Sequence, residues 1–129
     1  MTYVDKFLYD KPSVLIGRKG SISSPQFVEV PFWTVDTLFY TEICEDYDPY
    51  HVFQIVSNVN WMKYNEATGV PSLNTVGINS VKVFVPKSLD EQKNITKFSR
   101  NIDDKIEYVK TQITQAQQFK KGLLQQMFV

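Results

Sequence analysis

The stretch Ser88-Leu89-Asp90-Glu91-Gln92 opens the part of the chain that decides the fold. Ser88 and Glu91 have the spacing of a capping box, in which each side chain satisfies a backbone N–H left unpaired by the first helical turn. No proline follows, and no acidic residue follows Glu107, an order that the helix macrodipole favours. The sequence predicts one α-helix within residues 88–128, about 58 Å long if it runs unbroken from Leu89 to Met127 at ~1.5 Å per residue.

Apolar residues recur along this helix at heptad spacing. They are Ile95, Phe98, Ile102, Ile106, Val109, Ile113, Ala116, Leu123 and Met127. Their steps follow the three-and-four rhythm of a coiled coil, with one extra four-residue step between Ile102 and Ile106. We call this stripe the seam and expect it to be a helix–helix interface.

The seam is too long to be buried on a domain formed by residues 1–87. We therefore expect the helix to project and to pair with a second copy of the chain, with another subunit, or with both. The alternative is a helix that folds back over its own domain.

Residues 1–87 have a different character, because they hold all 6 prolines and both tryptophans. Short β-type runs separated by turns predict a small β-rich domain, so the fold class is α+β with one long coiled-coil helix. Strands are expected over residues 13–16, 26–30, 33–40 and 81–85, and residues 69–72 are expected to form a loop. Asp48 followed by Pro49 predicts a helix start, with Val52, Ile55, Val56 and Val59 at helical spacing behind it.

Composition excludes several classes of protein. The chain contains one cysteine, Cys44, which excludes an internal disulfide and a thiolate metal cluster. No apolar run reaches the roughly 18–20 residues of a membrane span, and residues 1–10 lack a signal-peptide core, so we expect a cytoplasmic protein without a membrane partner. The formal net charge of zero gives no sign of the basic surplus that DNA-binding proteins usually carry.

Catalytic motifs are absent from the sequence. No G-x-S-x-G, H-E-x-x-H or Walker-type loop occurs, and we expect no catalytic residue, no metal and no cofactor. The single histidine, His51, is interpreted as a surface residue in the first turn of a helix. The alternative, a small enzyme, would use Asp48 and His51 as an acid–base pair.

Binding chemistry is present in three polar clusters. Arg18 and Lys19 stand between two glycines, where a phosphate can meet both side chains and free backbone N–H groups. The other clusters are Lys63, Tyr64 and Asn65, and then Asn74, Thr75 and Asn79. Asparagine can pair with adenine in the major groove, although it is also a common turn former, and basic turns often only join strands.

Several of these motifs together resemble the DNA-specificity subunits of type I restriction–modification systems. Phe84-Val85-Pro86-Lys87-Ser88-Leu89-Asp90-Glu91-Gln92 resembles the family's junction between a strand and a long helix, and Lys120-Lys121-Gly122-Leu123-Leu124-Gln125-Gln126-Met127-Phe128 resembles the end of that helix. Upstream, Leu15-Ile16-Gly17-Arg18-Lys19-Gly20-Ser21-Ile22 is similar to its basic glycine turn. Asp36-Thr37-Leu38-Phe39-Tyr40 is similar to the next strand, and Gly69-Val70-Pro71-Ser72-Leu73-Asn74 to a later loop.

The resemblance implies a DNA-recognition role without catalysis. In this family two target-recognition domains each read half of a split DNA site, and conserved helices separate them and dock the methyltransferase subunits. It implies double-stranded DNA, a methyltransferase (modification) subunit and a second copy of the chain as partners. The DNA-binding residues expected here are Arg18, Lys19, Ser21, Lys63, Asn65, Asn74 and Thr75.

The chain departs from the family pattern in having one recognition region and one long helix. We expect at most a half subunit, which restores the two-fold plan by pairing through its helix. The recognition region is also shorter than is usual, and the shortfall is N-terminal, so part of the base-reading surface is expected to be absent. The alternative function is a truncated or silent specificity fragment that acts only as a helix-mediated dimerisation module with little DNA binding.

Overall fold

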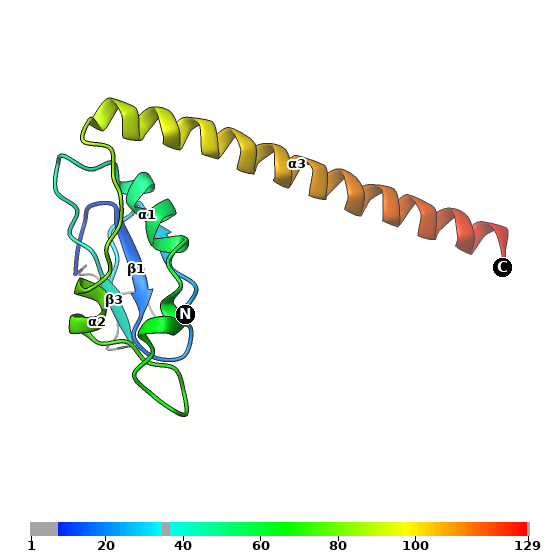
Figure 1. Ribbon diagram of the computed structural model, residues 1–129. Helices are drawn as coiled ribbons and strands as arrows, with labels where there is room; N and C mark the ends of the chain where they lie inside the picture. Colours follow the sequence, from blue (N-terminus) through cyan, green and yellow to red (C-terminus); the bar gives the residue numbers. More distant parts are fainter. Residues whose placement is uncertain (1–7, 35–36, 129) are drawn as a thin grey trace. The chain divides into compact units, whose positions relative to one another are not determined.

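The computed structural model describes residues 8–34 and 37–128 (Figure 1). The chain divides into two compact units, Met1–Lys93 (unit 1) and Asn94–Val129 (unit 2). Unit 1 is a small α+β domain, and unit 2 is the greater part of the long helix α3, which confirms the α+β fold class. Of the helices in the described ranges, none has the length and apolar character needed to cross a membrane.

The sheet of unit 1 has three antiparallel strands in the order β2-β1-β3. They are β1 (Ser13–Gly17), β2 (Gln26–Val28) and β3 (Leu38–Tyr40). All five residues of β1 are buried, as expected for a strand with neighbours on both edges. Three of the four expected strands exist, but β2 and β3 are shorter than predicted, and residues 35–36 of the third lie outside the described residues.

Helix α1 (Pro49–Ser57) packs against the sheet. It begins where the sequence predicts, because the Asp48 carboxylate accepts a hydrogen bond from the backbone N–H of His51 at 3.0 Å. The buried apolar core consists of Val14, Ile16, Ile22, Trp61 and Leu73, with Val52, Phe53 and Val56 of α1 packed against it.

Residues 81–85 are not a strand, so this prediction is wrong. The segment is irregular, and none of the described residues forms a β-ladder with it. Val81, Val83 and Val85 line one hollow beside α1, whereas the Phe84 side chain is fully exposed. Alternating β-branched residues favour extended backbone, but a strand also requires a neighbouring strand, which the local pattern does not report.

Two short helical elements were not expected. The 3₁₀ helix η1 (Trp61–Tyr64) follows α1, and helix α2 (Thr75–Asn79) stands where the sequence indicated a loop. Asn74 caps α2, since its side-chain oxygen accepts a hydrogen bond from the Gly77 N–H at 2.7 Å. The loop predicted over residues 69–72 is present, with Ser72 forming an isolated β-bridge to Lys19.

Helix α3 (Leu89–Met127) is 39 residues long. It confirms the predicted helix to within one residue at each end. Ser88 caps its first turn, because its hydroxyl oxygen accepts a hydrogen bond from the Glu91 N–H at 3.4 Å. The last predicted helical residue, Phe128, lies just beyond its end.

Candidate nucleic-acid interface

The basic turn at the end of β1 is held by the loop that precedes α2. Lys19 and Ser72 form an antiparallel bridge. On either side of it, the Gly20 N–H donates to the Pro71 carbonyl, and the Arg18 carbonyl accepts from the Leu73 N–H, both at 2.8 Å. The backbone of the turn is therefore fixed, while the side chains of Arg18 and Lys19 are exposed.

The same loop brings the other polar clusters to this turn. The Asn65 side-chain oxygen accepts hydrogen bonds from the N–H groups of Ala67 and Ser72, both at 3.0 Å. Asn74 and Thr75 follow the loop directly, and an added Cβ on Gly77 would lie 3.8 Å from the Tyr64 carbonyl oxygen, so α2 lies against η1. We call this region the recognition end and define it by Arg18, Lys19, Ser21, Asn65, Asn74 and Thr75.

The two glycines of the turn are required for different reasons. Gly20 has a φ of 79°, a left-handed conformation that side-chain-bearing residues rarely adopt. Gly17 ends β1, where an added Cβ would lie only 2.4 Å from the Ser21 carbonyl oxygen. Of these two glycines, Gly20 is the one with positive φ.

Arg18 is held in place by strand β3. The backbone N–H of Arg18 donates to the Thr37 carbonyl at 2.8 Å. The guanidinium carbon of its side chain lies 4.3 Å from the centre of the Phe39 ring. This is a cation–π contact, which orients the planar guanidinium without using its N–H donors. Arg18 is therefore a preoriented cation directly after the end of the central strand β1.

An acidic loop follows β3 at the other end of the sheet. The β1–β3 register pairs Gly17 with Leu38 near the recognition end, and the Thr41 N–H donates to the Val14 carbonyl toward the opposite end. Glu42, Glu45 and Asp46 follow Thr41 in exposed positions. The exposed cations of the turn and this acidic loop thus lie at opposite ends of β1, and Glu66 is an exposed carboxylate in the loop at the recognition end.

The family of the chain follows from a comparison with known protein families. A family model described as "type I restriction modification DNA specificity domain" matches residues 1–118. The chain belongs to this DNA-specificity domain family. A search of curated proteins gives no match. The family suspected from the sequence motifs is confirmed, and a role in DNA specificity within a type I restriction–modification system follows from it.

Lys63 of this specificity domain lies in a different setting from the turn. It lines a shallow groove of about 410 Å³ together with Lys82, Asn58, Asn60 and other residues. Lys82 was not identified from the sequence, because 19 positions separate it from Lys63 and only the fold places the two along one groove. The groove is a second basic surface of the specificity domain.

The two asparagines of the recognition end have structural tasks. The side-chain oxygen of Asn65 fixes the loop, and that of Asn74 caps α2. This is the turn-forming behaviour considered as the alternative to base reading. Their amide NH₂ groups are the part of each side chain with which they can donate to a base edge.

His51 is buried in the specificity domain, so the prediction of a surface position is wrong. Only 6% of the residue is exposed, and neither ring nitrogen has a hydrogen-bond partner among the described residues. His51 precedes Ile55 by one helical turn and lies beside the apolar stripe of α1, which explains its burial. The Asp48 carboxylate accepts a hydrogen bond from the backbone N–H of His51 and not from its imidazole ring. In a catalytic acid–base pair the carboxylate would bond the ring.

Gln92 was missed by the sequence interpretation, which treated it only as a helix-opening residue. Its side chain is fully buried within unit 1. The amide oxygen accepts from the Asp48 N–H at 2.9 Å, and the amide nitrogen donates to the carbonyls of Pro86 (2.8 Å) and Asp46 (3.3 Å). Gln92 therefore fixes the first turns of α3 to unit 1.

Tyr40 at the end of β3 marks the acidic side of the sheet. Its pKa is raised above the ordinary value, first by desolvation and then by the Glu42 carboxylate, to which its hydroxyl donates at 3.4 Å.

Among the described residues, no group of three or more His, Cys, Asp or Glu side chains is arranged to hold a metal ion.

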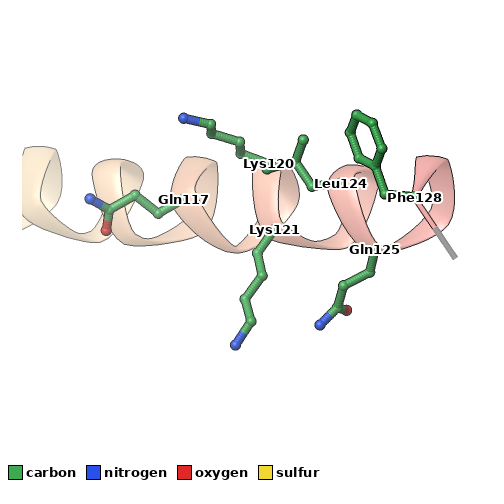
Figure 2. Close-up of a pocket in the computed structure, with 6 residues that line it drawn as sticks. All are labelled: Gln117, Lys120, Lys121, Leu124, Gln125 and Phe128. Atoms are coloured by element: carbon green, nitrogen blue, oxygen red, sulfur yellow. The ribbon is translucent and has the colours of Figure 1, made fainter.

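The seam residues of α3 are all exposed within unit 2. Near the helix end, Lys120, Leu124 and Phe128 point to one side of α3, and Lys121 and Gln125 point to the other (Figure 2). These five residues and Gln117 line a shallow hollow of about 630 Å³. Leu124 and Phe128, which were not assigned to the seam, widen the apolar face beside Leu123 and Met127.

Proposed function

We propose that this chain is the DNA-recognition component of a type I restriction–modification complex and that it catalyses no reaction itself. In this proposal the recognition end of unit 1 contacts duplex DNA. The protein acts in the cytoplasm. Methylation and cleavage belong to the partner subunits, as the family resemblance implies.

The observation that carries the proposal is the construction of the recognition end. Five hydrogen bonds join the turn, the loop and η1: the N–H groups of Gly20 and Glu66 donate two of them, and the Arg18 carbonyl and the Asn65 side-chain oxygen accept the other three. Rigid backbone supports exposed cations, with the acidic loop at the far end of β1. Phosphate contacts by Arg and Lys position a protein on DNA, and polar side chains such as Asn and Thr then reach base edges.

Titration of a fluorescent duplex with the full chain tests the DNA-binding proposal. We expect binding at low salt that weakens as salt rises, with a slope of log K against log salt of about −0.9 per phosphate contact. Arg18→Ala and Lys19→Ala should each reduce that slope by about one contact. A wild-type chain that does not bind duplex even at low salt would contradict this function.

For α3 we propose pairing with a second copy of the chain and docking of a methyltransferase subunit. The support is the row of exposed apolar residues at heptad spacing over most of the helix. Exposure of this apolar surface to water is unfavourable, and pairing with another helix would bury it. Two copies paired about a two-fold axis would present two recognition ends. Sedimentation of the chain alone and with a purified methyltransferase subunit tests each partner separately.

The second candidate is a helix-mediated interaction module with little affinity for DNA. The observation in its favour is the contrast between the long exposed seam and a sheet of only three short strands, which offers few positions for base-reading side chains. Self-association without duplex binding at low salt would support this function over the first.

A further inference from the structure

The geometry points to Phe39 as a positioning residue for DNA binding. We infer that its ring holds the Arg18 guanidinium in one plane, so that two N–H donors can bond the two free oxygens of one DNA phosphate. This inference rests on the proposed DNA-binding function. It gives a task to Phe39, an apolar residue that the sequence motifs include only as part of a strand and that is not among the expected DNA-binding residues.

The register of the sheet creates the contact. Ile16 pairs with Phe39, and the Arg18 N–H donates to the Thr37 carbonyl, so Arg18 lies diagonally across from Phe39. Residues two apart on a strand share a face, and therefore the Arg18 side chain leaves β1 on the same face as Ile16. Phe39 is half-buried against the core, which fixes its ring beneath the guanidinium.

The contact leaves the charge of Arg18 available. A stacked guanidinium keeps its N–H donors at the edge of its plane, the arrangement that suits bidentate bonding to phosphate. In the part of the chain that the structure describes, no salt bridge involves Arg18. An oriented arginine loses less side-chain freedom on binding than a freely rotating one, so the ring should increase affinity without contributing charge.

A double-mutant cycle on the full chain tests the inference, with a short fluorescent duplex of mixed sequence as the probe. We expect Phe39→Leu to raise the Kd by about two- to fivefold, the range of an exposed cation–π contact. In an Arg18→Ala background, Phe39→Leu should leave the Kd unchanged. Phe39→Leu should also leave the salt slope unchanged, because no charge is removed, whereas Arg18→Ala lowers it by about 0.9.

Two further variants keep the test decisive. Phe27→Leu is the matched control, because Phe27 packs against the same core from β2 and should lose comparable stability without a change in Kd. Arg18→Lys keeps the charge but lacks the planar fork, so it should weaken binding, and Phe39→Leu should then have a smaller effect than it has beside Arg18.

The outcomes separate the inference from the function on which it rests. Phe39→Leu weakening binding equally with and without Arg18, or no more than Phe27→Leu does, would overturn the positioning role while DNA binding stands. No duplex binding by the wild-type chain at low salt would instead reject the proposed function and the inference with it.

Discussion

The side-chain oxygen of Gln92 accepts a hydrogen bond from the backbone N–H of Asp48 at 2.9 Å. Asp48 is also the cap of α1, and Gln92 lies in the first turns of α3. One buried amide thus joins the starts of two helices that are 40 residues apart in sequence (residue 49 to residue 89). Its amide nitrogen bonds two further carbonyls, so both ends of the amide are used.

Gln92→Ala is predicted to destabilise unit 1 by about 1–3 kcal/mol, because it leaves the Asp48 N–H and the Pro86 carbonyl without their partner. Urea denaturation followed by tryptophan fluorescence measures the change, since Trp61 is in the core. The control is Gln117→Ala, which removes an exposed glutamine from the same helix and should have almost no effect. Equal losses in the two variants would show that the buried amide is not important.

Gly17→Ala is predicted to destabilise unit 1 by about 1–3 kcal/mol, the range for overpacking a filled site, because its Cβ would be 2.4 Å from backbone. Gly20→Ala should also destabilise it, by about 1–2 kcal/mol, through its left-handed φ. Gly69→Ala is the control, because no atom lies within 4 Å of its added Cβ. Thermal melts that rank Gly69→Ala with the other two would contradict this account of the turn.

Asn65 allows the structural and the DNA-reading roles to be separated. Asn65→Asp keeps an oxygen that accepts from Ala67 and Ser72, so the loop should stay protected from hydrogen exchange, while duplex affinity falls because of the added negative charge. Asn65→Ala removes both hydrogen bonds and should increase exchange over residues 66–72. Unchanged exchange in Asn65→Ala would show that the side chain does not hold the loop.

Local patterns predicted the helices best. The cap at Ser88, the heptads behind it and the Asp48-Pro49 start depend on residues within a few turns of one another, and both helices begin as predicted. The segment 81–85 has an equally clear local pattern and is still not a strand, since strand pairing depends on distant chain. The short helix α2 was missed because the Asn74 cap was interpreted as part of a loop.

The candidate site was predictable as residues but not as an arrangement. Arg18 and Asn74 were each identified from residue type and local context. Their joining through the loop at Ser72, and the placement of Phe39 under Arg18, follow from contacts over tens of residues. His51 shows the converse, because a polar residue beside an apolar stripe was assigned to the surface and is buried.

The last prediction concerns the seam. Ile106→Asp or Ile113→Asp is predicted to dissociate the oligomer that we propose for α3, because each would place an unpaired charge in an apolar helix–helix contact. A penalty of about 3 kcal/mol corresponds to a roughly 100-fold higher dissociation constant, which sedimentation equilibrium can measure. Thr111→Asp is the matched control, because at about 100° per residue Thr111 lies on the face of α3 opposite the seam. If sedimentation is the same for all three variants and the wild type, the seam is not the interface, and α3 must act through another face.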